Sequence, residues 1–130
     1  MSASGAGGTQ DLNGSFMDEN CVFCRIVRGQ IPSPRVYEDD QVIAINDINP
    51  AAPIHLLLVP KEHVESLMTA GPQHEALMGK MLLLAARLAR EQGSDNGFRV
   101  VINNGPGGGQ EVFHLHMHVL AGPRPWKRTL

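Results

Sequence analysis

The sequence predicts an α+β fold with a mostly antiparallel sheet, one long helix and one short helix. One long amphipathic segment lies between two groups of short apolar segments, and these do not alternate in the strand–helix–strand series of a parallel sheet. Hydrophobic residues make up 42% of the 130 residues and charged residues 18%, which is typical of a folded globular domain. We expect one domain with a C-terminal tail over residues 20–130, preceded by a flexible Gly/Ser/Ala-rich leader over residues 1–19.

Short runs of apolar and β-branched residues predict the strands. These runs cover residues 36–38, 41–45, 55–59, 98–102 and 112–120. The first two flank the acidic pair Asp39-Asp40, which favours a hairpin. The third is apolar and ends at Pro60, so we expect it to be buried.

The long helix is expected over residues 72–92. Leu77, Met81, Leu84 and Leu88 recur at three- and four-residue spacing, which places them on one apolar face. Gly71-Pro72 opens this segment and Gly93 follows it, as is common at helix ends.

A short helix is expected over residues 61–69. Residues 26–32 are expected to form a short ordered turn. His74, near the start of the long helix, is expected to be a solvent-exposed histidine.

Charge and hydropathy argue against two kinds of partner. The formal net charge is -2, whereas nucleic-acid-binding domains usually present a strongly basic face. The longest apolar run, residues 81–86, is far shorter than the ~20 residues that span a bilayer. Residues 1–20 contain no Lys or Arg and no apolar stretch, so no signal peptide is predicted. We expect a cytoplasmic protein with neither a nucleic-acid polymer nor a membrane as its partner.

Three histidines alternate with apolar residues near the C-terminus. In a strand, His114, His116 and His118 share one face, while Leu115 and Met117 share the other. Imidazole is readily neutral near physiological pH, so three on one face suit either metal binding or nucleophilic catalysis. A polar sheet face turned to solvent is the third interpretation.

A glycine-rich loop over residues 103–110 leads into the histidines. Glycine lets backbone N–H groups turn outward and approach an anion closely. The loop matches neither a Walker A motif nor a dinucleotide-binding fingerprint, because no Gly-Lys-Ser/Thr follows and it leads into a strand. Combined with the histidines, it indicates a phosphate held beside a nucleophile.

The segment from His114 to Leu120 fits the signature His-φ-His-φ-His-φ-φ, where φ is apolar. The chain resembles the histidine triad (HIT) family, most closely its Hint branch of nucleotide-binding hydrolases. The resemblance covers residues 20–126 and includes residues 23–32, Asp47-Ile48, Pro53-Ile54-His55, residues 60–63 and the glycine-rich loop. It implies a HIT-like fold whose sheet continues across a homodimer, with a purine nucleotide as ligand.

The resemblance also implies the catalytic roles. His116 corresponds to the nucleophile, which attacks the α-phosphorus of a nucleoside 5′-phosphoramidate or related compound. A covalent nucleotidyl-histidine forms, and water then releases the nucleoside monophosphate. His118 contacts the phosphate or assists the leaving group, and His55 completes the relay.

Nucleotide-binding residues are implied in the same way. Asp47 is the expected ribose ligand, and the tail residue Trp126 is expected to reach the nucleotide site of the partner subunit in the homodimer. The full expected set is Phe23, Ile26, Asp47, Ile48, Asn103, Gly109, Gln110, Val112, His116, His118 and Trp126. Glu111 departs from the family pattern, where a small hydroxyl residue often touches phosphate, and its carboxylate would repel an anion.

A structural zinc site is implied by the resemblance to family members that carry a Cys-x-x-Cys pair. Its expected ligands are Cys21, Cys24, His63 and His114. No organic cofactor is expected. The basic tail residues Arg124, Lys127 and Arg128 are expected only to face solvent.

Two other functions remain open from the sequence. One is a zinc-dependent hydrolase in which His114, His116 and His118 all bind a catalytic metal. The other is a nucleotide-binding regulatory module with little turnover.

Overall fold

The computed structural model describes residues 8–10 and 16–130, and its main body is a five-stranded sheet of order β3-β4-β5-β7-β6. All neighbouring strands in this sheet are antiparallel. The strands are β3 (Arg35–Glu38), β4 (Val42–Asn46), β5 (Ile54–Pro60), β6 (Arg99–Val101) and β7 (Met117–Ala121). The predicted α+β class with an antiparallel sheet is confirmed.

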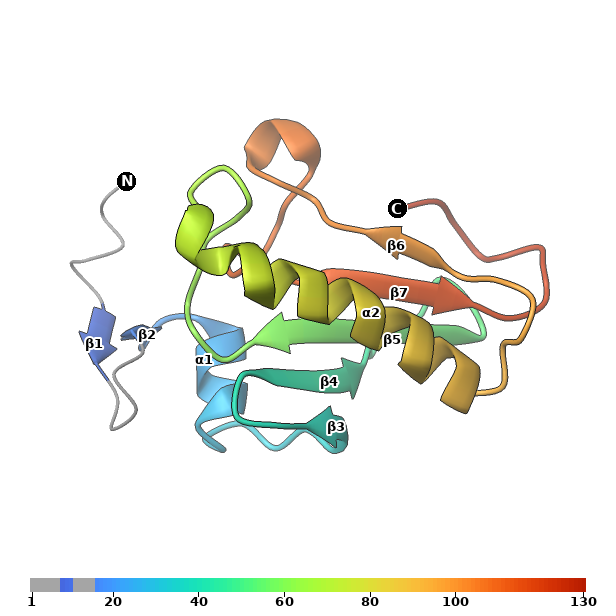
Figure 1. Ribbon diagram of the computed structural model, residues 1–130, viewed down its shortest axis with the longest axis horizontal. Helices are drawn as coiled ribbons and strands as arrows, with labels where there is room; N and C mark the ends of the chain where they lie inside the picture. Colours follow the sequence, from blue (N-terminus) through green and yellow to red (C-terminus); the bar gives the residue numbers. More distant parts are fainter. Residues whose placement is uncertain (1–7, 11–15) are drawn as a thin grey trace.

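The long helix α2 (Glu75–Glu91) lies across one face of this sheet (Figure 1). Its buried residues include the predicted Leu77, Met81, Leu84 and Leu88, which pack against inward side chains of the central strands. A 3₁₀ turn over Pro72–His74 leads into the helix, so the expected segment is confirmed with a tighter first turn.

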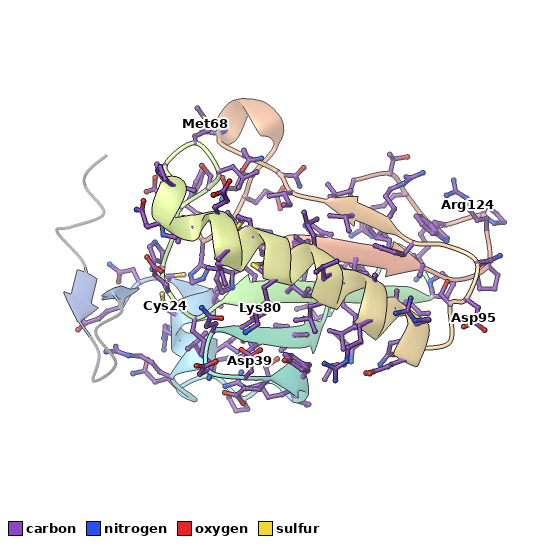
Figure 2. All side chains as sticks on the ribbon, viewed as in Figure 1. Cys24, Asp39, Met68, Lys80, Asp95 and Arg124 are labelled. Carbon is purple, nitrogen blue, oxygen red and sulfur yellow. The ribbon has the colours of Figure 1, made fainter. Side chains whose placement is uncertain are left out.

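A polar contact also links α2 to the β3–β4 hairpin. Lys80 Nζ lies 2.7 Å from a carboxylate oxygen of Asp39 in the hairpin turn (Figure 2). The other oxygen of Asp39 accepts hydrogen bonds from the backbone N–H groups of Gln41 and Val42. Burial opposes ionisation of the Asp39 carboxyl, but the contacts with Lys80, with the Tyr37 hydroxyl and with the two backbone N–H groups hold its pKa below its usual range.

The short helix is α1 (Val22–Val27), which packs on the opposite face of the sheet from α2. Phe23 and Ile26 of α1 contact a cluster containing Ile43 of β4 and Leu57 of β5. The Cys21 thiolate or thiol caps the helix by accepting from the backbone N–H of Cys24, at 3.4 Å. Six residues are too few to show a helical period, which is why the sequence did not reveal this helix.

The expected helix over residues 61–69 is wrong, because that segment is irregular and ends in a turn. Both Thr69 and Ala70 donate backbone hydrogen bonds to the carbonyl of Ser66. The last strand is also shorter than expected: β7 begins only at Met117, although Leu115 N–H donates to the Val64 carbonyl at 2.7 Å.

His74 is buried with 6% exposure, so the expectation of a solvent-exposed side chain is wrong. Its Nδ1 accepts from the backbone N–H of Gly71, and its Nε2 lies 3.0 Å from a Glu62 carboxylate oxygen. These contacts give the ring a structural position at the start of the helical region.

Part of the expected leader, residues 1–7 and 11–15, lies outside the described residues. The strands β1 (Gly8–Gln10) and β2 (Phe16–Asp18) form a separate antiparallel pair. Among the helices that the structure describes, none has the length and apolar character needed to cross a membrane.

Candidate active site

The face of the sheet opposite α2 carries the catalytic candidates. Leu115 and Met117 are fully buried in the core beneath α2, so the alternating histidines project from the other face. His118 of β7 pairs in register with Leu57 of β5, which places His55, two residues earlier in β5, diagonally across from it. The predicted common face is therefore correct, although only His118 lies within the strand itself.

His116 is held by its own backbone. Its Nδ1 lies 2.7 Å from the carbonyl oxygen of His114, and a carbonyl can only accept, so Nδ1 carries the proton. In the neutral ring the lone pair is then on Nε2. The ring packs against Phe23, with centroids 5.0 Å apart, and is partly exposed to the cavity described below.

His55 and His118 form a hydrogen-bonded pair whose tautomers follow from the backbone. The N–H of Ala51 donates to His55 Nδ1 at 2.9 Å, so the proton of the neutral His55 ring is on Nε2. That Nε2 lies 2.9 Å from His118 Nδ1, which must then accept. The proton of neutral His118 is consequently on Nε2, the nitrogen left to act as a donor.

Asp47 extends this chain from the turn after β4. One carboxylate oxygen lies 3.3 Å from His55 Nε2, and the other accepts from the backbone N–H of Asn49 at 2.8 Å. The second bond closes a turn that fixes the carboxylate beside the histidine pair.

Burial keeps all three rings neutral. Removal from water is the main cause that lowers the pKa of His55, His116 and His118. The pKa of His118 falls to about 4, helped by repulsion from His116 and His55. At physiological pH the site thus presents one unprotonated nitrogen and one N–H donor on neighbouring rings, with centroids 5.1 Å apart.

These groups border a cavity of about 460 Å³. Seven of the predicted residues line it: Phe23, Asp47, Asn103, Gly109, Val112, His116 and His118. Asn49, Leu57, Gly108, Glu111, Arg128 and Leu130 complete the lining. His55 lies behind His118, to which its Nε2 is hydrogen-bonded, with its side chain fully buried.

The glycine-rich loop forms one wall of the cavity through a 3₁₀ turn over Pro106–Gly108. Gly109 follows with a φ of +83°, a left-handed conformation that favours glycine. Gln110, which is in the predicted nucleotide-binding set, has a side chain that is buried and bonded within the protein. Its amide accepts from the Gly105 N–H and donates to the carbonyls of Glu65 and Val112, so Gln110 shapes the loop instead.

Three other predicted ligand residues do not line this cavity. Ile26 is buried in the core beneath α1, where its side chain packs against the sheet. Ile48 is fully exposed and is not among the residues that line this cavity. Trp126 lies under the guanidinium groups of Arg99 and Arg124, at 5.1 and 4.4 Å from the ring centroid.

Arg128 is exposed, as expected, and it also lines the cavity, which was not expected. Its guanidinium donates to the Asn49 carbonyl at 2.8 Å. Nothing in the local sequence signals this position, because it depends on the tail folding back across the turn after β4. Glu111, whose carboxylate disagrees with the family pattern, also lines the cavity.

A second cluster brings together the four residues of the expected metal set, Cys21, Cys24, His63 and His114. Their sulfur and Nδ1 atoms lie between 3.1 and 3.5 Å apart in the contacts that connect them. A tetrahedral zinc with bonds of 2.0–2.3 Å separates its ligand atoms by roughly 3.3–3.8 Å. Adjacent thiols and imidazoles also lower the pKa of the Cys21 thiol, chiefly through Cys24, although burial opposes them.

The ring of His114 is oriented as a metal ligand requires. It is completely buried, and its Nε2 lies 2.8 Å from the Pro60 carbonyl, so Nε2 carries the proton and Nδ1 has the lone pair. The four residues therefore fit a structural zinc. The alternative in which His114, His116 and His118 share one metal is not supported, because His116 belongs to neither group of candidate ligands among the described residues.

The fold and these two clusters define a small α+β protein with a histidine-lined cavity beside a cysteine–histidine metal-type cluster. The model of the HIT domain family matches residues 28–124. The chain therefore belongs to the HIT domain family.

Two curated relatives illustrate this membership. Protein HitA of Neisseria gonorrhoeae is 51% identical over 105 residues, which cover 81% of this chain and 98% of HitA. The purine nucleoside phosphoramidase of Escherichia coli strain K12 is 41% identical over 107 residues, which cover 82% of this chain and 90% of that enzyme.

Solved structures are equally similar. A HIT family hydrolase from Legionella pneumophila Philadelphia 1 is 42% identical with a TM-score of 0.78, covering 81% of this chain and 95% of that one. A Zn-bound histidine triad family protein from Mycobacterium smegmatis is 41% identical with a TM-score of 0.69, covering 78% of this chain and 73% of that one.

Proposed function

We propose that this chain hydrolyses nucleoside 5′-phosphoramidates, or related compounds with an activated α-phosphate, through a covalent intermediate on His116. The observation that carries the proposal is the 2.7 Å contact between His116 Nδ1 and the His114 carbonyl. It leaves Nε2 as the unprotonated nitrogen, and burial lowers the pKa of the ring so that it stays neutral. The similarity to the E. coli purine nucleoside phosphoramidase supports the substrate class.

The reaction would proceed in two displacements. First, His116 Nε2 forms a bond to the α-phosphorus while the bond from phosphorus to the leaving nitrogen breaks. The leaving nitrogen takes a proton from Nε2 of a His118 ring that carries protons on both nitrogens, so a neutral ring remains and the nitrogen departs as an amine. Water then attacks the phosphorus, the bond to His116 breaks, and His118 takes up the proton that the water loses, which releases the nucleoside monophosphate.

The remaining chain of hydrogen bonds would support His118 as a proton carrier. His118 is positively charged while it holds the extra proton. The pair of His55 and Asp47 lies behind it. The Asp47 carboxylate offers acceptors for the ribose hydroxyls at the cavity wall. The loop around Gly109 offers backbone N–H groups to the phosphate, and Phe23, Leu57 and Val112 give an apolar wall for a base.

We further propose a structural zinc held by Cys21, Cys24, His63 and His114. When bound, the ion would tie α1 to the segment that carries the triad. The Zn-bound relative from M. smegmatis supports this assignment. His116 would remain outside the zinc shell and available for the reaction.

We also propose that the protein is a cytoplasmic homodimer of the Hint branch whose sheet continues across the two subunits. The edge strand β6 leaves one side of its backbone available for pairing. Leu82 and Leu83 of α2 are 50% and 77% exposed, which provides an apolar surface on the helix for a second copy.

Replacement of the nucleophile tests the proposal. We expect His116→Asn to abolish hydrolysis of adenosine 5′-phosphoramidate while retaining affinity for adenosine 5′-monophosphate (AMP), because the asparagine removes only the attacking nitrogen. With a slow adenylate substrate, the wild-type protein should gain the mass of one adenylyl group on the peptide that contains His116. Full turnover by His116→Asn would contradict the mechanism. AMP binding by a wild-type protein that turns over no phosphoramidate would instead favour the regulatory module.

A further inference from the structure

The C-terminal tail is fixed against the same chain that forms the cavity. Lys127 N–H donates to the Ala51 carbonyl at 2.8 Å, and Trp126 Nε1 donates to the Gly122 carbonyl at 3.1 Å. The indole also packs against a buried cluster that includes Ala51 and Ala52. These contacts determine where the next residue, Arg128, lies.

Arg128 is attached to the turn that presents Asp47. Asn49 takes part in both contacts: its N–H donates to Asp47 and its carbonyl accepts from Arg128. A guanidinium has five N–H donors in a planar fork, so one bond to Asn49 leaves others available. The side chain lines the cavity that Asp47, His116 and His118 also line.

The charges that line the cavity indicate what Arg128 does there. Two carboxylates, Asp47 and Glu111, line the cavity, and Arg128 is the one Lys or Arg among its described lining residues. A nucleoside monophosphate is a dianion near neutral pH, so the carboxylates oppose its entry. Repulsion from the Arg128 charge is a minor contribution to the lowered pKa of His55 and of His118, after burial.

We propose that Arg128 is a nucleotide-binding residue of its own chain's site, where its guanidinium attracts the phosphate and sets the preference for AMP over uncharged adenosine. This inference rests on the proposed function, since it assigns a ligand contact to the same cavity. The tail thereby contributes to the site in cis, through the residue after the one that anchors it to Ala51.

A comparison of charged and uncharged ligands tests this role. Calorimetry would measure the affinities of the full chain for AMP and for adenosine, in wild type, Arg128→Gln and Arg128→Lys. We expect Arg128→Gln to weaken AMP about tenfold, the size of one charge-assisted hydrogen bond, and to change adenosine by less than about twofold. Arg128→Lys should recover most of the AMP affinity, and added salt should reduce the wild-type preference for AMP.

The matched control is Lys127→Gln, which removes one positive charge from the same tail at a side chain that does not line the cavity. It should leave the affinity for AMP within about twofold of wild type. A purely structural role for Arg128 would weaken AMP and adenosine equally, and that result would overturn the inference. An unchanged AMP affinity in Arg128→Gln would also overturn it, while leaving the proposed function intact. Failure of the wild-type protein to bind AMP would refute both.

Discussion

The low pKa of His118 predicts that acid weakens the native state through this ring. In the unfolded chain the imidazole has its ordinary pKa of 6.5, whereas in the native protein burial and two neighbouring histidines lower it to about 4. As the pH falls below 6.5, the unfolded chain binds a proton that the native site does not. The free energy of unfolding therefore falls with decreasing pH between those two values, and is unaffected by this ring above them.

The magnitude follows from the shift. A pH of 5 lies about 1.5 units below the pKa of the unfolded ring, which is therefore protonated. The native ring is still neutral at this pH. At 1.36 kcal/mol per unit, His118 should lower the free energy of unfolding by about 2 kcal/mol between pH 7 and pH 5. His118→Asn removes the titrating group but keeps an acceptor oxygen near the position of Nδ1, so His55 retains its partner.

Urea unfolding at pH 7 and pH 5 would measure this difference. A chelator in every sample keeps the cysteine–histidine cluster free of metal in both proteins, and the other titrating groups are common to both. We expect the wild-type protein to lose about 2 kcal/mol more than His118→Asn between the two pH values. The same pH dependence in both proteins would refute the assignment of a buried, neutral His118.

Two further predictions concern the metal cluster and Glu111. Removing zinc with a chelator should lower the midpoint of thermal unfolding by about 10 °C, because the ion binds only the folded protein. Loss of one ligand in Cys24→Ser should abolish zinc binding as measured by elemental analysis; a purified protein that binds no added zinc and shows no shift would contradict the site. Glu111→Gln removes a carboxylate from the cavity lining and should raise the affinity for AMP about threefold by calorimetry. Glu75→Gln on the exposed start of α2 is the control, and weaker AMP binding in Glu111→Gln would show that the carboxylate assists the ligand.

Local patterns predicted the features that depend on neighbouring residues. The spacing of Leu77, Met81, Leu84 and Leu88 identified α2, because a 17-residue amphipathic helix shows its period clearly. The period of two around His116 likewise predicted a common face, although the strand begins only at Met117. In both cases, side-chain direction follows from backbone geometry alone.

Contacts between distant segments were not predictable from these patterns. The position of Arg128 depends on a bond to Asn49, 79 residues earlier in the chain. The role of Gln110 depends on the Glu65 carbonyl, and the burial of His74 depends on Glu62. The resemblance to the family supplied the cysteine–histidine cluster, whose members lie far apart in the sequence.

Main-chain groups, which do not titrate, determine which nitrogen of each histidine ring carries the proton. The His114 carbonyl fixes the proton of His116 on Nδ1, and the Ala51 N–H fixes the proton of His55 on Nε2. The second constraint passes through the His55–His118 bond and places the proton of His118 on its Nε2. Two adjacent rings of the same chemical type therefore present a lone pair on one ring and a proton on the other. Because a backbone carbonyl and a backbone amide set this arrangement, it should persist when the lining side chains Glu111 and Arg128 are changed, so that those substitutions alter binding while the chemistry at His116 continues.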